Sequence, residues 1–275
     1  MKSSSWTGER LETHIFNNTT IEHLHRYSLA ITFCADKIVL DIACGDGYGS
    51  NLLAKNSLKV IGVDIKESVI VEAKKKYIRS NLSFLQGSTS NIPLTDSSVD
   101  VVVSFETIEH HDEHEQMMKE IKRVLKPAGL LIISSPDKKN YSEEANYTNP
   151  YHIKELYFEE FKQLIHTFFT NYHFYSQKII QGSLIIHEKD KNLFTEYAGT
   201  FEDVNEIKDF KPVYHFCLAS DQSIQELGNS FFRDDLNQFK NYQNYITNKY
   251  QQSYSYRLGN FLLFPFSFLK RLWSR

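Results

Sequence analysis

The sequence predicts an α/β fold: a doubly wound, mostly parallel sheet of seven strands. Short β-branched runs alternate with amphipathic helical segments along residues 37–136, which is the pattern of βαβ units. The run VDVVVSF (residues 99–105) is apolar enough to be buried on both faces, as strands of parallel sheets are. Glycines cluster only in CGDGYG (residues 44–49), directly after the first such run, at the kind of strand end where open α/β sheets bind ligands.

Length, charge and cysteine content narrow the class of protein. The 275 residues suffice for one large domain or a domain with an appendage. A net charge of −3 excludes a global basic field for nucleic acid, and three cysteines without a spaced framework favour a reducing compartment. The N-terminus lacks the apolar core of a signal peptide, and no 18-residue apolar run is present. We therefore expect a cytoplasmic protein.

The elements of the first half follow one another regularly. A helix is expected over residues 20–34, where apolar residues recur at helical spacing. Pro and Gly residues end the last helix before the fifth strand. Strands are expected at 37–43, 58–65, 81–87, 99–105 and 130–136, with helices at 48–56, 67–79 and 113–129 between them.

The pattern changes after Pro136. A polar connection leads to an amphipathic helix over 153–169, and strands over 172–180 and 211–220 complete the predicted seven. The predicted divisions of the chain are an N-terminal arm and helix over the ligand site (1–36), a main domain (37–220) with an acidic insertion (188–210), and a helical C-terminal tail (221–275).

Two features point to a nucleoside-containing ligand. Asp41 ends the first strand and is followed by Gly45, Gly47 and Gly49, so backbone amides there can approach a ligand closely. Asp64 ends the second strand and can accept hydrogen bonds from both hydroxyls of a ribose.

The spacing G-x-G-x-G differs from the G-x-G-x-x-G fingerprint of nicotinamide dehydrogenases. A carboxylate at Asp41 would repel a pyrophosphate, whereas it suits an ammonium and a sulfonium group, which favours S-adenosylmethionine. The alternative is a glycine-rich turn that binds no ligand.

The ordered segments VLDIACGDGYG, VIGVDI, FLQGS, NIPLTDSSVDVVVSFETIEH and IKRVLKPAGLLIISSP resemble the successive motifs of class I S-adenosylmethionine-dependent methyltransferases. The resemblance covers residues 37–136 and implies a Rossmann-like fold. The cofactor contacts that it implies are Asp41, Ala43, Cys44, Gly45, Gly47, Asp64, Ile65, Gly87, Ser88, Thr89, Ser104 and Phe105.

The resemblance also assigns roles to these residues. The Asp41 side chain and the backbone of 43–45 hold the methionine end, Asp64 takes the ribose hydroxyls, and Ile65 packs on adenine. Ser88 stands where most relatives have an acid that accepts from the adenine amino group. Ser104 and Phe105 border the sulfonium and its methyl.

The stretch SFETIEHHDEH (residues 104–114) follows the fourth strand and carries candidate catalytic residues. Glu106, Glu109 and His110 share one face if the chain is helical there, and two carboxylates with an imidazole can hold Mg²⁺ or another divalent cation. The E-x-x-E-H pattern resembles metal-assisted O-methyltransferases of ubiquinone pathways and of small RNAs. The small-RNA enzymes add a downstream histidine, which His152 supplies here.

Other interpretations of this stretch stay open. Without a metal, His110 can act as the general base while Glu106 and Glu109 contact substrate. The acids can also simply favour a helix N-terminus. His111 and His114 are expected to be solvated, and the H-x-x-E-H pattern within 110–114 is not taken as a peptidase motif, because it lies at a strand end of a cofactor-binding fold.

Three segments, near the two ends of the chain and after the fifth strand, indicate the cellular process in which the protein acts. WTGER (6–10) and NPYHIKELYFEEF (149–161) resemble segments of methyltransferases from bacterial surface-polysaccharide gene clusters, which implies Arg10 near the cofactor carboxylate. The tail over 256–275 carries four basic residues among Phe, Leu and Trp, which suits binding at the inner face of the membrane. It can equally pack on the domain or on a glycan-enzyme partner.

We therefore expect an S-adenosylmethionine-dependent O-methyltransferase whose acceptor is a saccharide or sugar phosphate in cell-surface polysaccharide biosynthesis. The alternatives are a small-molecule O-methyltransferase of the quinone-precursor type and a non-catalytic, cofactor-binding accessory protein of a glycan assembly complex. No nucleic-acid partner is expected, because no basic stripe with aromatic platforms is present.

Overall fold

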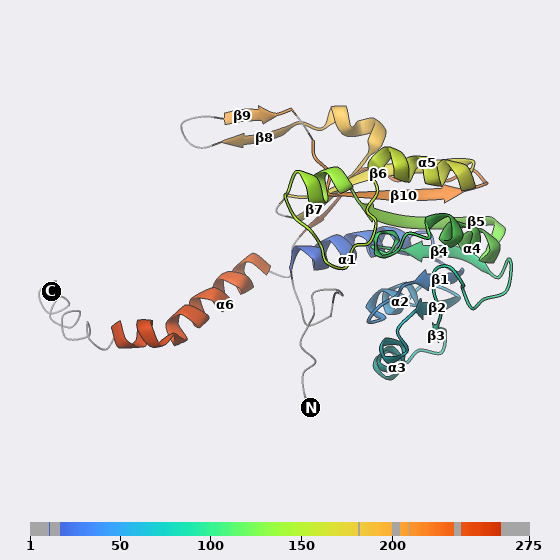
Figure 1. Ribbon diagram of the computed structural model, residues 1–275, viewed down its shortest axis with the longest axis horizontal. Coiled ribbons are helices and arrows are strands. Elements are labelled where there is room, and N and C mark those ends of the chain that lie inside the picture. The colour runs from blue at the N-terminus through green and yellow to red at the C-terminus, as the bar shows by residue number, and fades with distance from the viewer. Residues whose placement is uncertain are drawn as a thin grey trace, which may run out of the picture. The chain divides into compact units, whose positions relative to one another are not determined.

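The computed structural model describes residues 11, 17–180, 182–199, 204–208, 210–233 and 238–259 (Figure 1). The chain divides into two compact units, Met1–Arg233 and Asp234–Arg275. Helix α6 (Gln238–Gln252) belongs to the second unit. The predicted contact Arg10, the WTGER segment and the tail beyond Gly259 lie outside the described residues.

A nine-stranded sheet organises the first unit, in the order β11-β7-β6-β10-β5-β4-β1-β2-β3 (Figure 1). The central strands β1 to β5 pair in parallel, and β10, β6, β7 and β11 extend the sheet by antiparallel pairing. The α/β class and the parallel central sheet are thus confirmed. The strands are β1 (Ile38–Ile42), β2 (Lys59–Asp64), β3 (Leu82–Gln86), β4 (Val99–Ser104), β5 (Leu125–Pro136), β6 (Asn171–Ile179), β7 (Gly182–His187), β10 (Tyr214–Ser220) and β11 (Ser230–Arg233).

The predicted count of seven strands was wrong, because β7 and β11 also join the sheet. β7 follows β6 after a tight reversal in which Ile180 N donates to Gly182 O at 2.8 Å. Every residue of β7 is buried, so its sequence lacks the alternation that distinguishes a strand on the surface. β11 has only four residues and lies within the 221–275 span that was predicted to be helical.

Each helix predicted within residues 20–169 is present, but two boundaries move for tertiary reasons. Helix α4 ends at Val124, because Leu125 already pairs with Val99 of β4. Helix α5 begins at Phe158, because Ile153 N and Lys154 N both donate to the Glu109 carbonyl, at 2.8 and 3.1 Å. The helices are α1 (Asn18–Ile31), α2 (Tyr48–Leu53), α3 (Glu67–Lys76), α4 (His114–Val124) and α5 (Phe158–Phe168).

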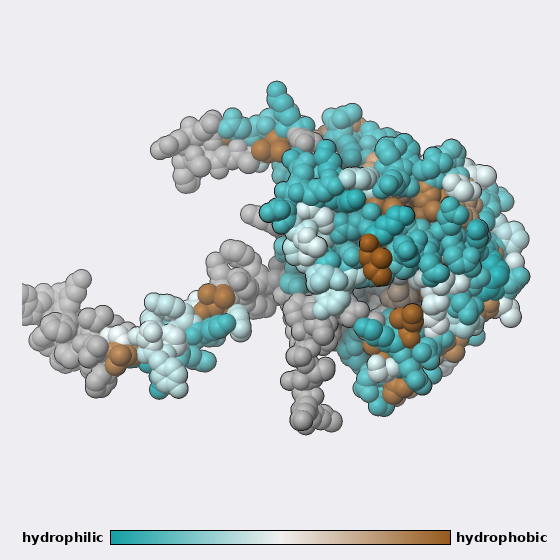
Figure 2. Space-filling model, viewed as in Figure 1, coloured by the Kyte–Doolittle hydropathy of each residue, from teal (hydrophilic) through white to brown (hydrophobic). Residues whose placement is uncertain are grey.

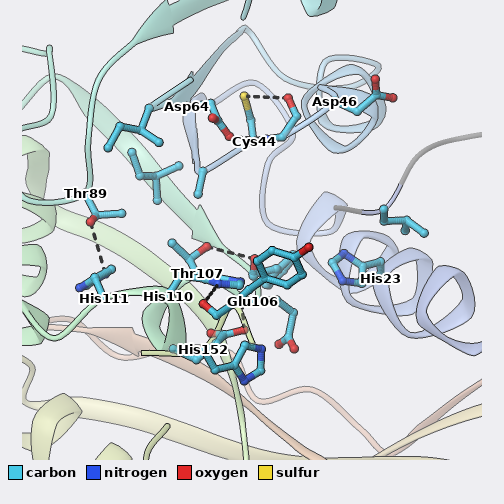
Figure 3. A pocket seen from close by; sticks show the side chains of 18 of the residues that line it. His23, Cys44, Asp46, Asp64, Thr89, Glu106, Thr107, His110, His111 and His152 are labelled. Carbon is cyan, nitrogen blue, oxygen red and sulfur yellow. Dashed lines mark hydrogen bonds and ion pairs between the residues drawn. The ribbon is translucent and has the colours of Figure 1, made fainter. Parts of the chain in front are cut away.

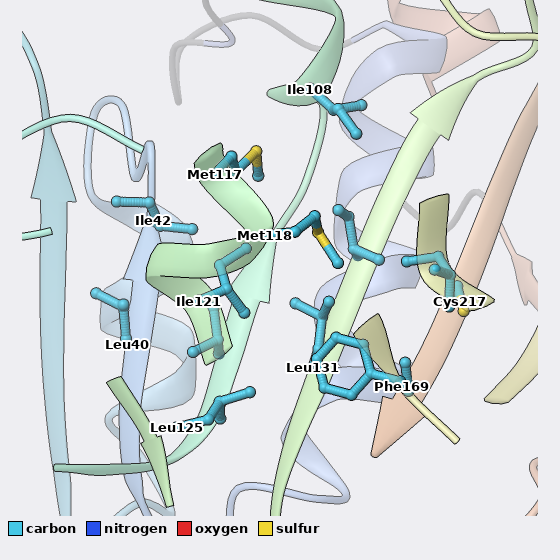
Figure 4. Packing of buried hydrophobic residues seen from close by; sticks show 14 of the residues in the cluster. Leu40, Ile42, Ile108, Met117, Met118, Ile121, Leu125, Leu131, Phe169 and Cys217 are labelled. Carbon is cyan, nitrogen blue, oxygen red and sulfur yellow. The ribbon is translucent and has the colours of Figure 1, made fainter. Parts of the chain in front are cut away.

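Side chains of the parallel strands alternate between two apolar layers. Leu40 and Ile42 of β1 pack with Met118 of α4 and with α5 in one layer (Figure 4). Val39 points the other way and packs with Tyr27 of α1 and with α2. Helices cover both faces of the parallel sheet. A ligand site can therefore form only beyond the ends of the strands.

Residues 188–210 contain the short helix η3 (Glu188–Leu193) and a separate hairpin of β8 (Glu196–Gly199) and β9 (Val204–Ile207). On the face that Figure 2 shows, the described part of the first unit is mainly hydrophilic, with apolar side chains scattered singly. Such scattered exposure is ordinary for a folded domain. Within the described residues, no helix has the length and apolar character needed to cross a membrane.

Candidate active site

A cavity of about 560 Å³ opens at the carboxyl ends of β1 to β4. Its walls are the loops that follow these four strands, the start of α1, the segment 141–152 and Tyr214. Asp64 and Cys44 lie on one side of it, and Glu106, His110 and His152 on the other (Figure 3). The volume is in the range of ligand-binding clefts.

The loop after β1 presents backbone to the cavity. Ala43, Gly45 and Gly47 have φ angles of 58°, 52° and 82°, so three residues of one turn are left-handed. For Ala43 this conformation is strained, and such strain persists where surrounding structure enforces it. Two hydrogen bonds to β2 enforce it here, since Cys44 N donates to Val63 O at 2.9 Å and Gly45 N to Asp64 Oδ2 at 3.0 Å. The predicted contacts Ala43, Cys44 and Gly45 line the cavity.

Asp64 joins the glycine loop to the cavity wall. It is 3% exposed, and its Oδ1 accepts from Lys66 N at 3.0 Å while Oδ2 accepts from Gly45 N. Ile65 beside it is 63% exposed and offers a flat apolar contact for a base. Gly87, Ser88, Thr89 and Phe105 also line the cavity, and Ser88 Oγ lies 3.3 Å from Ser90 Oγ. These residues fit the adenosine part of S-adenosylmethionine.

Asp41 lies behind the cavity wall, which differs from its predicted direct contact. Its carboxylate accepts from Ser50 Oγ at 2.6 Å and from Tyr27 Oη at 3.2 Å, and Tyr27, unlike Asp41, lines the cavity. The predicted contacts Gly47 and Ser104 also lie off the cavity wall. Burial raises the pKa of Asp41 to about 6, although the hydrogen bonds from Ser50 and Tyr27 act the other way.

This raised pKa predicts a pH-dependent cost in stability. Because the folded state holds the Asp41 proton more tightly than the unfolded chain, the free energy of unfolding falls as pH rises from about 4 to about 6. The Asp41→Asn variant lacks this titration. Its stability relative to wild type should therefore rise by about 2 kcal/mol between pH 4 and pH 7, measured by urea unfolding at each pH.

Asp100→Asn is the control with the opposite sign. Burial alone would raise the pKa of Asp100. Hydrogen bonds from Lys126 Nζ and Ile38 N outweigh this effect and hold the pKa of Asp100 below its ordinary value. Asp100 therefore adds stability that is lost as pH falls below its ordinary pKa of about 4, so the stability of Asp100→Asn relative to wild type should decrease as pH rises toward 4 and then stay nearly level up to pH 7. Parallel curves for Asp41→Asn and wild type would contradict the raised pKa.

The other half of the cavity brings together Glu109, His110 and His152. One ligand atom from each lies within 4.8 Å of the others. Glu109 is 1% exposed, and its Oε2 has no hydrogen-bond partner. Burial, with the nearby Glu106 charge, raises the pKa of Glu109 well above its ordinary value. His110 Nδ1 lies 2.9 Å from the Tyr151 carbonyl, which can only accept, so Nε2 keeps a lone pair and lies 3.9 Å from Glu109 Oε1.

Glu106 lies on the cavity wall but outside this trio, so the predicted four-ligand set is corrected to three. Its Oε1 accepts from Ser134 Oγ at 2.7 Å and pairs with Arg26 Nη1 at 3.1 Å. Arg26 is fully buried. The expected helical face does not form, because Glu106 has a φ of 49° and only a short 3₁₀ turn, η1 (Ile108–His110), follows.

Two histidines expected in solvent are packed at the site. His111 lines the cavity, and its Nε2 lies 3.3 Å from Thr89 Oγ1. His114 is 6% exposed, and its Nε2 donates to the His111 carbonyl at 2.8 Å. The sequence could not predict this packing, because solvated histidines at the start of a helix would occupy the same positions in the sequence.

An aromatic wall on the acceptor side was not predicted residue by residue. The Tyr141 ring stacks on His152 with centroids 5.2 Å apart and lies 5.8 Å from both Tyr147 and Tyr214. The only sequence signal is the density of tyrosines between 141 and 151. Tyr214 comes from β10, far along the chain, and only the sheet order places it here.

A second cluster, His173, His187 and Glu226, has a similar spacing but a different character. His187 Nδ1 accepts from Lys189 N at 3.1 Å, so the proton of a neutral ring sits on Nε2, which faces Glu226 at 3.3 Å. The Lys189 ammonium also pairs with Glu226. These contacts describe an ion-paired cluster without a free nitrogen on His187 for a cation.

Comparison with known proteins agrees with the cofactor half of the site. Residues 40–133 match a family described as a methyltransferase domain. A "Probable S-adenosylmethionine-dependent methyltransferase" of Mycolicibacterium smegmatis is 37% identical over 135 residues, or 49% of this chain and 52% of the relative. One of Mycobacterium tuberculosis is 35% identical over 162 residues, or 58% of each. The chain thus spans about half the length of the curated relatives it matches.

Solved structures show the same fold. An S-adenosylmethionine-dependent methyltransferase of Archaeoglobus fulgidus superposes with a TM-score of 0.54 at 20% identity, over 73% of this chain and 92% of that one. One of Thermotoga maritima gives a TM-score of 0.54 at 20% identity, over 74% and 90%. Residues 40–133 thus match a methyltransferase domain, the solved structures share its fold, and the similar S-adenosylmethionine-dependent enzymes support S-adenosylmethionine as the cofactor.

Proposed function

We propose that this protein is an O-methyltransferase that transfers the methyl group of S-adenosylmethionine to a hydroxyl of a saccharide or sugar phosphate during bacterial surface-polysaccharide biosynthesis. The observation that carries the proposal is that one cavity joins the Asp64 nucleoside site to the trio of Glu109, which is buried, and His110 and His152, which are half-buried. Such a juxtaposition can hold a methyl donor and a hydroxyl with its base in line.

The chain's residues account for the proton. S-adenosylmethionine supplies an electrophilic methyl group on a positively charged sulfur. As the acceptor oxygen bonds to the methyl carbon, the carbon–sulfur bond breaks and its electron pair stays on sulfur. His110 Nε2 takes the hydroxyl proton, since the Tyr151 carbonyl holds the other ring nitrogen protonated. The imidazolium that results favours the ionised form of Glu109, whose Oε1 lies 3.9 Å away, and that carboxylate in turn stabilises the imidazolium.

The aromatic wall supports a cyclic acceptor with both apolar and polar faces. Tyr141, Tyr147 and Tyr214 present ring faces and hydroxyls, and the Asn149 amide lies among them. Aromatic rings with a few fixed polar groups are the usual lining of sites that orient such ligands.

As the alternative to a metal-free base, we propose a divalent cation at Glu109, His110 and His152, since the single Nε2 lone pair of His110 cannot both bind a cation and take the proton. Two imidazoles and one carboxylate suit a borderline transition ion better than Mg²⁺, which prefers oxygen ligands. A bound cation would lower the pKa of the acceptor hydroxyl.

Chelation tests this metal site together with the function. Cofactor turnover is measured against nucleotide sugars and lipid-linked glycans, before and after exhaustive chelation and re-addition of Mn²⁺, Co²⁺ or Mg²⁺. We expect kcat to fall at least about tenfold on chelation and to recover better with Mn²⁺ or Co²⁺ than with Mg²⁺. Full activity after chelation would contradict the metal, and no turnover on any glycan would contradict the acceptor class.

A hydroxylated lipid is the second candidate acceptor. A Mycobacterium tuberculosis relative named "Phthiotriol/phenolphthiotriol dimycocerosates methyltransferase" is 30% identical over 115 residues, or 41% of this chain and 42% of the relative. Long-chain diols in the same turnover panel distinguish this acceptor. A chain that binds no S-adenosylmethionine by calorimetry would instead have an accessory role.

We propose that the C-terminal unit binds the inner face of the membrane. Helix α6 and the turn after it expose Tyr245, Ile246, Tyr250 and Leu258, and the sequence beyond is basic and aromatic. Deleting residues 253–275 should abolish co-sedimentation with vesicles containing anionic lipid, while cofactor affinity stays unchanged. Unchanged co-sedimentation would contradict the proposal.

A further inference from the structure

A chain of hydrogen bonds runs through the segment that covers the acceptor side. Tyr151 N donates to Asn149 Oδ1 at 3.0 Å, which orients the amide so that its Nδ2 faces His152 Nε2, also at 3.0 Å. On the other side of the ring, His152 Nδ1 lies 2.5 Å from Glu155 Oε1. Ser142 Oγ donates to Glu155 Oε2 at 2.5 Å. A backbone N–H, which can only donate, thus starts a network whose direction is fixed throughout.

This network selects one tautomer of His152. The Asn149 amide nitrogen donates, so Nε2 must accept, and the ring proton must sit on Nδ1, facing Glu155. The side chains of His152 and Glu155 are 7% and 9% exposed, so solvent does not compete for these bonds.

His110 is held in the same tautomer by a different partner, the Tyr151 carbonyl. Nε2 of His110 lies 3.9 Å from Glu109 Oε1, and one ring nitrogen of His152 lies within 4.8 Å of ligand atoms of both residues. Glu109 Oε2 is buried without a hydrogen-bond partner beside these two oriented rings. Histidines that ligate metals usually donate their second nitrogen to a carboxylate or a carbonyl in this way.

We propose that Glu155 is the positioning residue of this site: it holds the proton of His152 on Nδ1, so that Nε2 is preformed as a ligand beside Glu109 and His110. The Asn149 amide covers that nitrogen while no cation is bound, and it moves away when one binds. The tautomer of His152 is a property of the chain itself. Only the role given to that tautomer, which is to bind a cation, rests on the proposed metal-assisted function.

Nitrogen chemical shifts test the tautomer without metal or turnover. In the full chain labelled with ¹⁵N-histidine, two-bond proton–nitrogen correlations should show His152 protonated on Nδ1, with His152→Asn used to assign the signals. In Asn149→Ala, where Glu155 alone orients the ring, the proton should stay on Nδ1, and in the double variant Asn149→Ala/Glu155→Ala it should move toward Nε2. A wild-type proton on Nε2, or the same pattern in the double variant as in Asn149→Ala, would overturn the inference.

Cation binding tests the consequence. Co²⁺ is titrated into the metal-free chain and followed by visible absorption and calorimetry. Glu155→Ala should bind Co²⁺ about 10- to 100-fold more weakly, and Glu155→Gln should lose less. Asn149→Ala should bind at least as tightly as wild type, because the competing amide is gone. The matched control Glu159→Ala, whose side chain is 77% exposed on α5, should bind normally.

The possible failures are distinguishable. If the wild-type chain binds no Co²⁺, the proposed metal fails, while the nitrogen shifts still decide the role of Glu155. If the wild type binds and Glu155→Ala binds equally well, Glu155 has no positioning role, while the proposed function stands. S-adenosylmethionine affinity should be the same in every variant and serves as the check that each one is folded.

Discussion

Replacing Asp64 by alanine is expected to weaken S-adenosylmethionine binding about 100- to 1000-fold. The buried carboxylate accepts from Gly45 N and Lys66 N, and it is positioned for the ribose hydroxyls. Hydrogen bonds to a charged group contribute about 1.5–3 kcal/mol each, and 1.4 kcal/mol is a factor of ten in affinity. Loss of the bond to Gly45 also releases the left-handed turn that lines the cavity. Isothermal titration with S-adenosylmethionine measures the effect.

Asp100→Ala is the matched control for Asp64→Ala. Asp100 also accepts a strand-end backbone N–H, from Ile38, but Ile38 begins β1 whereas the cavity lies beyond the end of that strand. Its replacement should lower stability while leaving cofactor affinity within about twofold of wild type. Equal losses of affinity in the two variants would mean that the Asp64 effect is one of stability rather than of binding.

Replacing His110 by alanine is expected to lower kcat about 100- to 10,000-fold while cofactor affinity stays unchanged. A positioned general base contributes a rate factor of this size. The loss should fall on kcat, because His110 lies on the acceptor side of the cavity, opposite Asp64 (Figure 3). Single-turnover kinetics with saturating cofactor measures the chemical step.

His166→Ala provides the comparison, since His166 is exposed on α5. It should turn over as wild type does. A His110→Ala variant with normal kcat would remove His110 from the chemistry. A variant that binds the cofactor poorly would instead place His110 in the cofactor half of the site.

The sequence predicted the parts of the site that depend on local patterns better than the parts that depend on contacts between distant residues. The glycine loop, Asp64 and Ile65 were predictable, because they follow strands that local β-branched runs reveal and a spacing that the chemistry requires. Asp41 was predicted to contact the ligand directly. In the structure Asp41 lies off the cavity wall and accepts from Tyr27 of α1, and no local pattern encodes such a contact.

The candidate metal ligands show the same difference between what local sequence indicates and what tertiary contacts decide. Glu109, His110 and His152 were all candidates, and their proximity is found in the structure. Glu106 shares the helical spacing with Glu109 and His110 but pairs with Arg26 of α1 instead. Glu155 went unpredicted because the sequence places it at the start of a helix. The chain there remains extended, since Ile153 and Lys154 bind the carbonyl of Glu109.

The sequence by itself determined the α/β class, the order of the central βαβ units and the chemistry of the cofactor end. Each of these depends on periodicity and on spacing within one loop, which are local properties of the chain. The tertiary structure alone decided the two extra strands, the burial of Asp41 and Arg26, the aromatic wall completed by Tyr214, and the tautomers of His110 and His152. These depend on contacts between residues from different elements, which form only when the sheet and its helices assemble.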